Sequence, residues 1–450
     1  MEQFLAGYGC ADITPSRLGV PMDGHGNASE RLSTGVTSRL YALTLAVTDG
    51  EGATALLISA DLCGIAQHLC DELRQWAWEQ RQIPRENVIL SAIHQHTCPE
   101  ATSYADELLT GLKASVDRAL ADRSPARLYT HQLQTEAMNF LRRGFARDGT
   151  FFNPQTPIGP SGFDRYESQA DGQMRLIKFT RQEAKDILLV NFQGHPHMST
   201  ANTVTLIGSD WPGVMRGIVE KELGAHCIYF SGASGNLNSN SRIKAHNVSV
   251  DYIHHGQRAA RYVLEAEGRY REARLGPVRC REVTHLYPVD RSMAHLEAAA
   301  KVVAEARSQG ATHAKEVLKD YPQLSSIFQA SVIHRKAALG KEKECAISAV
   351  TFGDVAFTAH PYEMFDTNGR QLRDGTVGED GYEPQDQLEN PFAMTFITTR
   401  ANGAHCYIPS AFGFANGGYE RDTTLFAGGT GEKMVADYLR LLQQLHEKEN

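Results

Sequence analysis

The chain of 450 residues has no lysine- or arginine-rich run, and its 45 basic side chains are outnumbered by 53 acidic ones, which gives a net charge of −8. Proteins that bind the phosphate backbone of nucleic acids concentrate positive charge on one face, so we expect no nucleic-acid partner. No stretch approaches the roughly 18 consecutive apolar residues that span a bilayer, and we expect no stable membrane insertion. A small-molecule substrate is the partner that remains, and the composition leaves the oligomeric state open.

The eight cysteines are scattered, and no two of them form a Cys-x-x-Cys pair. This spacing is typical neither of a disulfide framework nor of a cysteine-rich zinc site. The first residues, Met1–Cys10, have neither the basic start nor the apolar centre of a secretory signal. We therefore expect a cytoplasmic protein, and an apolar content of 42% is enough to build a sizeable core.

Short apolar runs alternate with amphipathic segments along the chain. We predict strands over residues 42–47, 55–59, 87–93, 173–179, 186–192, 227–230, 346–352 and 355–359. Helical spacing of apolar residues predicts helices over 66–82, 103–122, 213–221, 250–266 and 431–449. Such alternation indicates the α/β class, with mixed β-sheets flanked by helices.

Two regions differ from this pattern. Residues 141–168 are rich in Arg, Gly, Pro and Phe without clear periodicity, so we interpret them as a long loop of the kind that overlies a site. Residues 290–340 are rich in Ala, Lys, Glu and Gln at helical spacing and predict a helical insertion. We expect both to belong to a single catalytic domain spanning residues 1–450.

Two His-x-His dyads, His94-Gln-His96 and His195-Pro-His197, each follow an apolar run that reads as a buried strand. Chance alone would place about 0.7 such pairs in a chain with this histidine content, so two pairs are only a mild excess. Their shared place at strand ends favours a site, because imidazoles held there lose little freedom on binding a cation such as Zn²⁺. Spacing alone supports metal ligands and ordinary histidines about equally.

Several short segments, in a fixed order along the chain, match the pattern of a known family. They are Tyr8–Pro15 (YGCADITP), Ser59–Gly64 (SADLCG), His94–Thr97 (HQHT), Gly194–Pro196 (GHP), Ser209–Gly213 (SDWPG) and Gly232–Asn236 (GASGN). In this order the chain resembles the neutral/alkaline non-lysosomal ceramidase superfamily, in its N-terminal catalytic domain. The resemblance runs from about residue 7 to residue 420.

The resemblance implies one Zn²⁺ per chain, held by His94, His195, Glu363 and Tyr407. Two imidazoles and a carboxylate leave positions on zinc for water and substrate, as in catalytic rather than structural sites. The resemblance also gives catalytic roles to His96 and Tyr419, which would stabilise a developing oxyanion or pass a proton. Tyr419 follows Tyr407 by the twelve residues that the family pattern requires.

The chain departs from the family pattern at Gly235–Asn240 (GNLNSN), where the family has an Asp and a Ser in the active site. Asn236 and Asn238 occupy those positions here, and an amide cannot take up a proton at neutral pH. We expect Asn236, Asn238 and Arg165 to bind substrate. The family's C-terminal immunoglobulin-like domain is not expected in this chain, which favours a soluble substrate over ceramide.

Each candidate has a plainer explanation. The ligand near residue 360 would be His360 if Glu363 were a surface carboxylate, and Tyr407 and Tyr419 would be ordinary half-buried aromatics. His197 follows a proline and would cap a loop. Asp61 and Asp210 would either orient ligating histidines or serve as strand-end and helix-cap carboxylates.

The function that we expect is zinc-dependent hydrolysis of an amide-like, N-acyl bond in a soluble small molecule. A first alternative is a metal-dependent hydrolase of a polar, sugar-like metabolite, which would be favoured if the polar residues Arg142, Arg143, Asn153, Arg165 and Gln173 lined the pocket. A second alternative is a binding protein that kept the fold and lost catalysis, for which the Asn236 and Asn238 replacements are the best evidence.

Overall fold

The computed structural model describes residues 3–24, 31–198, 202–292, 295–375 and 387–447. Its largest element is a nine-stranded sheet in the order β16-β14-β13-β8-β1-β4-β5-β6, with β18 also paired to β8. Its strands are β1 (Leu5–Asp12), β4 (Tyr41–Thr48), β5 (Thr54–Ala60), β6 (Val88–Ala92), β8 (Ser124–Gln134), β13 (Gln173–Arg181), β14 (Ile187–Phe192), β16 (His226–Ser231) and β18 (Arg271–Ala273). The β5–β6 and β14–β16 pairs are parallel and the others antiparallel, so the sheet is mixed as predicted.

A second sheet of four strands packs against one face of the first. Its order is β19-β20-β21-β23, formed by β19 (Val278–Pro288), β20 (Glu342–Phe352), β21 (Val355–His360) and β23 (Met394–Thr399). The side chains between the two sheets form one apolar cluster that includes Phe179, Phe230, Phe352, Phe357 and Phe396. The strands β14, β21 and β23 are covered on both faces and are buried along their whole length, so they do not alternate between buried and exposed residues.

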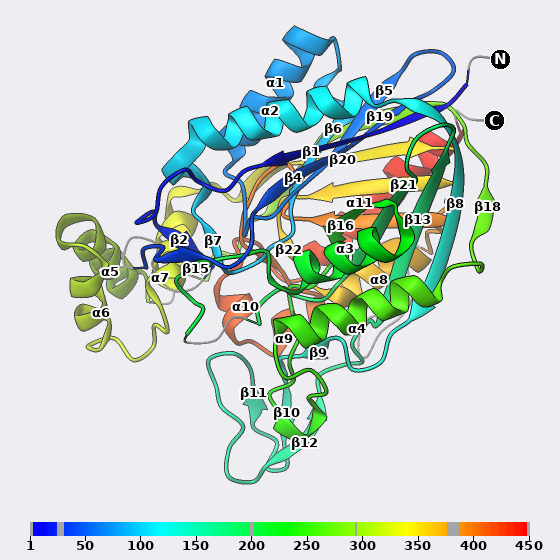
Figure 1. Ribbon diagram of the computed structural model, residues 1–450. Helices are drawn as coiled ribbons and strands as arrows, with labels where there is room; N and C mark the ends of the chain where they lie inside the picture. The colour runs from blue at the N-terminus through cyan, green and yellow to red at the C-terminus, as the bar shows by residue number, and fades with distance from the viewer. Residues whose placement is uncertain (1–2, 25–30, 199–201, 293–294, 376–386, 448–450) are drawn as a thin grey trace.

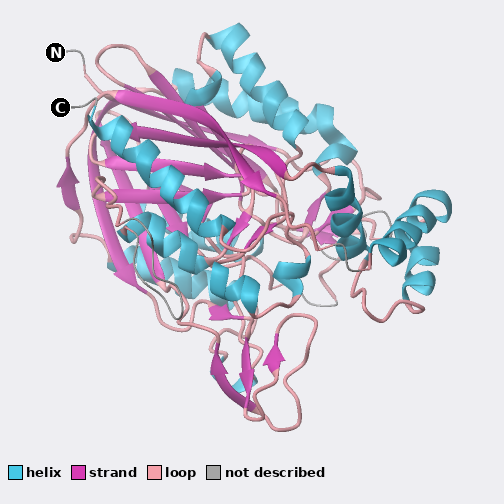
Figure 2. Cartoon of the chain, turned by 180° about the vertical axis from the view of Figure 1, so that it is seen from behind, coloured by secondary structure: helices cyan, strands magenta, loops and turns pink. Residues whose placement is uncertain are grey.

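Helices cover the outer faces of the two sheets (Figures 1 and 2). Helices α1 (Gln67–Arg81), α2 (Ala105–Ala121), α3 (Asp210–Leu223) and α4 (Tyr252–Glu265) pack on the nine-stranded sheet, and α8 (Asp366–Asp374) and α11 (Thr430–Glu447) on the four-stranded sheet. Helix α2 packs so closely on β1 that a Cβ at Gly9 would fall 1.8 Å from the Ser115 carbonyl oxygen. Glycine at this position therefore permits the contact. The predicted α/β class with helices flanking mixed sheets is confirmed.

The prediction of a long loop over residues 141–168 is wrong in part. The structure forms a small sheet there, in the order β11-β10-β12, from β10 (Gly144–Ala146), β11 (Phe151–Phe152) and β12 (Phe163–Tyr166). Aromatic contacts hold it together, with Phe163 packed edge-on against Tyr166 at a centroid distance of 4.8 Å. Strands of two to four residues are too short to show a period in the sequence, so their pattern resembles that of a loop.

Three helices lie between β19 and β20, at one side of the molecule (Figure 1). They are α5 (Leu296–Gln309), α6 (Ala311–Leu318) and α7 (Ile327–Ala338), and their apolar side chains form a separate small cluster that includes Val302 and Ala330. None of the helices in the described part of the chain combines the length and apolarity that a membrane crossing requires.

Candidate metal centre

His94 lies two residues beyond β6 in a left-handed backbone conformation, with φ of 63°. This conformation is strained for a residue with a side chain, and it is held by the His94 N–H donating to the Leu62 carbonyl at 2.9 Å. The imidazole Nδ1 lies 2.8 Å from the Cys63 carbonyl oxygen. Since a carbonyl only accepts, Nδ1 carries the proton, and Nε2 presents a lone pair as a metal ligand must.

His195 follows β14 and is 1% exposed. The Ser239 hydroxyl donates to its backbone carbonyl at 2.7 Å, which fixes the loop. Burial, with further contributions from His94 and Arg142, holds the pKa of His195 well below its ordinary value. The ring is therefore neutral over the physiological range, which is the form that binds a metal.

Glu363 and Tyr407 are brought together by a two-strand parallel pairing in which they lie directly opposite one another. The strands are β22 (Glu363–Met364) and β24 (Tyr407–Ile408), and the Glu363 N–H also donates to the Cys406 carbonyl at 3.2 Å. Both side chains are buried, Glu363 at 8% and Tyr407 at 5% exposure. Forty-three positions separate them in the sequence, so only this pairing makes them neighbours.

The Glu363 Oε2 atom lies 3.1 Å from Nε2 of His94. With the proton of a neutral His94 on Nδ1, the lone pair of Nε2 faces a carboxylate oxygen with no proton between them, and Oε2 forms no hydrogen bond with any residue that the structure describes. Two ligand atoms bound to a tetrahedral zinc at about 2.0–2.1 Å lie about 3.3 Å apart. Ligand atoms of His94, His195 and Glu363 all lie within 4.8 Å of one another. The arrangement fits a cation held by these three residues.

Charges around Glu363 keep it ionised. Burial raises the pKa of its carboxyl group, but a protonated His94, together with Arg400 and Arg142, outweighs burial and lowers that pKa to about 2. The nearest guanidinium contact is from Arg400 Nη1, which lies 3.6 Å from Oε1. Arg400 is itself fixed by donating to the Cys63 and His405 carbonyls. Oε1 therefore faces the arginine and Oε2 faces His94.

A second group that could bind a metal consists of Cys63, His94 and His96. In this group the Cys63 Sγ atom approaches His94 through Nδ1, at 3.6 Å. Nδ1 already carries the proton given to the Cys63 carbonyl, and burial raises the pKa of the Cys63 thiol well above its ordinary value. A protonated thiol and a protonated nitrogen are poor ligands, so the His94, His195 and Glu363 group is the better site.

His96 and His197 complete a cluster of four imidazoles. The His96 Nε2 atom lies 3.0 Å from Nε2 of His195 and 3.5 Å from Nε2 of His94. The ring of His197 packs against that of His96 at a centroid distance of 4.6 Å. The interpretation of His197 as a loop cap does not account for this contact. Its position in the second His-x-His dyad is the sequence signal for it.

Tyr419 lies beside Tyr407, with ring centroids 5.5 Å apart. It begins the short helix α10 (Tyr419–Asp422), and its backbone N–H donates to the Asn153 side chain at 3.3 Å. Burial and the charge of Glu363 raise the pKa of Tyr419 to about 12. The phenol is therefore protonated at neutral pH and available as a hydrogen-bond donor.

The residues expected to bind substrate are dispersed. The Asn236 amide is 1% exposed and exchanges two hydrogen bonds with Asp366, at 2.7 Å to its carboxylate and 2.9 Å from its backbone N–H. Asn238 lies in β17 (Leu237–Asn238), paired with Phe140. Arg165 lies on β12, with its side chain 65% exposed and paired with Asp164. The described contacts do not bring Arg165 to the metal centre.

The residues named as alternatives in the sequence analysis, His360, Asp61 and Asp210, also have defined hydrogen-bond partners. His360 lies 3.0 Å from the Thr358 hydroxyl, and burial lowers its pKa to about 3. Asp61 accepts from Arg216 at 2.6 Å rather than from a ligating histidine. Asp210 accepts the N–H of Met198 at 3.1 Å, and burial raises its pKa to about 6. Asp210 therefore holds the loop that carries the second dyad.

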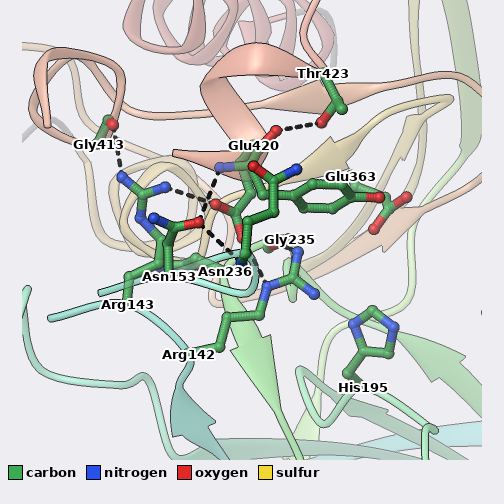
Figure 3. A network of polar contacts seen from close by, with 12 residues as sticks. Arg142, Arg143, Asn153, His195, Gly235, Asn236, Glu363, Gly413, Glu420 and Thr423 are labelled. Atoms are coloured by element: carbon green, nitrogen blue, oxygen red, sulfur yellow. Dashed lines mark hydrogen bonds and ion pairs between the residues drawn. The ribbon is translucent and has the colours of Figure 1, made fainter. Parts of the chain in front are cut away.

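Arg142 is the polar neighbour of the centre that sequence reasoning considered only as a pocket-lining residue. Figure 3 shows its guanidinium beside Gly235 and Glu420. Its Nε and Nη2 atoms each donate at 2.7 Å, to the Glu420 carboxylate and the Gly235 carbonyl, and its Cζ atom lies 5.4 Å from the Tyr407 ring centroid. The signal in the sequence is the charged pair Arg142-Arg143 directly after Phe140-Leu141.

The comparisons with known proteins agree with the resemblance expected from the sequence. The family model described as neutral/alkaline non-lysosomal ceramidase, N-terminal, matches residues 4–234. A neutral ceramidase of Oryza sativa subsp. japonica is 26% identical over 263 residues, which cover 55% of this chain and 32% of that protein. Neutral ceramidase 1 of Arabidopsis thaliana is 25% identical over 228 residues, covering 49% and 29%. The chain thus matches about three tenths of the length of each of these relatives.

Solved structures share the fold over nearly the whole chain. A structure described as ceramidase complexed with C2 superposes with a TM-score of 0.72 at 17% identity, covering 99% of this chain and 75% of that one. The neutral ceramidase from Pseudomonas aeruginosa gives a TM-score of 0.69 at 17% identity, covering 99% and 74%. At this identity the likeness concerns the fold.

Proposed function

The chain belongs to the neutral/alkaline non-lysosomal ceramidase family, and we propose that it is a zinc-dependent hydrolase that cleaves the amide bond of an N-acyl substrate. The observation that carries this proposal is the convergence of His94, His195 and Glu363, with an unprotonated nitrogen facing an unpaired carboxylate oxygen. A zinc ion there would polarise a carbonyl and lower the pKa of a bound water. Tyr407 is the proposed fourth ligand.

His96 and Tyr419 are proposed to stabilise the oxyanion that develops when an amide carbonyl is attacked. His96 approaches His195 to 3.0 Å, which places it at the edge of the ligand set. The phenol of Tyr419, with its pKa raised to about 12, keeps its proton and donates to a negative oxygen. Donors fixed in advance in a buried site contribute most where charge develops in the transition state.

Arg142 supports the same site electrostatically. Burial, Glu363 and Tyr419 raise the pKa of Tyr407 well above its ordinary value, and Arg142 is the neighbour that opposes this shift. The guanidinium therefore favours the phenolate form that a metal ligand requires. It also places a positive charge beside the position where an oxyanion would form.

The substrate class that we propose is a soluble N-acyl amide. Ceramide, after which the relatives are named, is a lipid member of that class. The guanidinium of Arg142 lies over the rings of Tyr407 and Tyr419, and the Tyr419 N–H donates to the Asn153 side chain. Polar neighbours of this kind favour a compound with a short acyl chain.

The test combines metal analysis with a substrate panel. The purified protein should hold one zinc per chain and release free amine from short N-acyl amides, and the double variant H94A/H195A should lose both properties. Esters and sugar glycosides in the same panel address hydrolysis without amide cleavage. Stoichiometric zinc in the double variant would overturn the site, and a zinc-loaded protein inactive on every amide would overturn the reaction and favour a binding protein.

A further inference from the structure

A buried network of four charged side chains lies beside the candidate metal centre, and Figure 3 shows Arg142, Arg143 and Glu420 of this network. Glu420, on α10, is 0% exposed and divides its two oxygens between adjacent arginines. Oε1 accepts from Nε of Arg142 at 2.7 Å, and Oε2 accepts from Nη1 of Arg143 at 2.6 Å. Glu167 is the fourth member and binds Arg143 with both oxygens, at 2.7 and 3.0 Å.

The two arginines depend on Glu420 to different degrees. Arg143 is also held by Glu167 and by the Gly413 carbonyl at 2.7 Å, so it would keep a carboxylate partner without Glu420. In the described part of the chain, Arg142 forms an ion pair with Glu420 alone and has the Gly235 carbonyl as its second acceptor. Removing the Glu420 charge would leave a buried guanidinium without a carboxylate, which is costly.

Besides Glu420, the carboxylate of Glu363 in the candidate metal centre acts electrostatically on Arg142. Arg142 contacts the ring of Tyr407, which lies opposite Glu363 in the β22–β24 pairing, and its charge already acts on Glu363. One oxygen of Glu363 faces Arg400, and the other faces His94 and forms no hydrogen bond within the described part of the chain. A released Arg142 would compete with a metal ion for that second oxygen.

We propose that Glu420 is a positioning residue that ties Arg142 away from Glu363 and so keeps this carboxylate available to the metal. The inference rests on the zinc site of the proposed function. Glu420 acts through Arg142 rather than by touching substrate. The same carboxylate fixes α10, whose first residue is Tyr419, so one side chain sets the position of both groups beside the Tyr407 ligand.

The matched pair of variants is E420Q and E167Q, since each removes one buried carboxylate charge from the same network. Zinc affinity, measured by competition with a chelator of known strength, should fall about 10- to 100-fold in E420Q, as for other residues that orient metal ligands. E167Q should lower the melting temperature but keep the zinc affinity of the original protein. Equal losses of affinity in the two variants would show a general structural effect and overturn the inference.

The double variant R142M/E420Q tests whether the released Arg142 causes the loss of zinc affinity in E420Q. If the released arginine is what occupies Glu363, the E420Q change should cost no further zinc affinity once Arg142 is gone, so the double variant should bind zinc as well as R142M alone. A double variant that binds zinc clearly more weakly than R142M overturns the inference. Should E420Q fail to fold, E420D, which keeps the charge but is one methylene shorter and so holds Arg142 less closely, should show a smaller loss of zinc affinity that also disappears in the R142M background.

These outcomes are independent of the reaction. A protein that binds zinc and shows the E420Q loss, absent in the R142M background, yet cleaves no amide, supports the positioning role and overturns the proposed function. A protein that cleaves amides but keeps its zinc affinity in E420Q supports the proposed function and overturns the positioning role.

Discussion

The candidate metal centre and the three-helix segment α5–α7 are built in contrasting ways. The centre takes His94, His195, Glu363 and Tyr407 from four separate stretches of chain, and each is held by backbone or charged partners. The helices take most of their contacts from one another, through an apolar cluster formed within residues 296–333. The difference teaches that precise placement of the centre comes from the sheets beneath it, whereas the helices are stabilised locally.

The comparison predicts that variants in the two regions separate function from stability. Changes at the centre should alter turnover with little effect on the free energy of unfolding, and changes at the base of the helices should do the reverse. Two measurements test this directly, and two others probe residues outside both regions; the largest expected effect comes first.

Tyr419→Phe removes the phenolic donor and keeps the ring against Tyr407. We expect kcat to fall about 10²- to 10³-fold, as for other single oxyanion donors, with zinc content and melting temperature unchanged. Steady-state kinetics on the best amide of the panel provide the measurement. A loss of zinc in this variant would show that Tyr419 supports the ligands rather than the transition state.

Lys336→Ala tests the base of the helical segment. Lys336, on α7, donates to Asp290 at 2.8 Å, and both side chains are buried, at 4% and 10% exposure. Leaving Asp290 without its partner should cost about 3 kcal/mol of unfolding free energy, measured by denaturant titration. Zinc affinity and kcat should stay at their original values. A matching fall in kcat would break the proposed separation of the two regions.

His255 provides a pH test in the helical layer outside both regions. It is fully buried on α4, where its Nδ1 lies 2.9 Å from the Ser249 hydroxyl, and burial lowers its pKa to about 3. The folded state therefore stays neutral where the unfolded chain takes up a proton, so stability falls as pH drops from about 6.5 toward 3, by up to about 1.4 kcal/mol per pH unit.

The variant His255→Gln should remove this part of the pH dependence. Its unfolding free energy should change less than that of the original protein between pH 6.5 and 4.5. The metal-free protein is used for both, so that protonation of metal ligands does not enter the comparison. Parallel pH curves would contradict the prediction.

Arg165→Ala should have the smallest effect. Its side chain is exposed and paired only with its neighbour Asp164 and the Phe145 ring in the described contacts, so we expect a change within about 0.5 kcal/mol in stability and no change in zinc content. Values of KM measured on the same amides complete the test. A tenfold rise in KM would place Arg165 in substrate binding, as the sequence interpretation expected.

Much of the scaffold was predictable because its signal is local. The buried strands β6 and β14 and the helices α2 and α11 lie close to their predicted bounds, since apolar runs and helical spacing are properties of neighbouring residues. Strand β8 was missed because its eleven residues, most of them polar or charged, show no apolar run. The small sheet of β10 to β12 was missed because its strands are too short to repeat a pattern.

The amino-acid sequence by itself determined the α/β class, the strand-end positions of the two histidine dyads and, through family resemblance, the set of candidate ligands. Only the tertiary structure decided which imidazole nitrogens face Glu363, that Glu363 and Tyr407 are paired, and that Glu420 holds Arg142. The physical reason is that a dyad records only its own neighbours in the chain. The facing atoms of His94 and Glu363 meet across 269 positions, and only the packing of two sheets brings them to 3.1 Å.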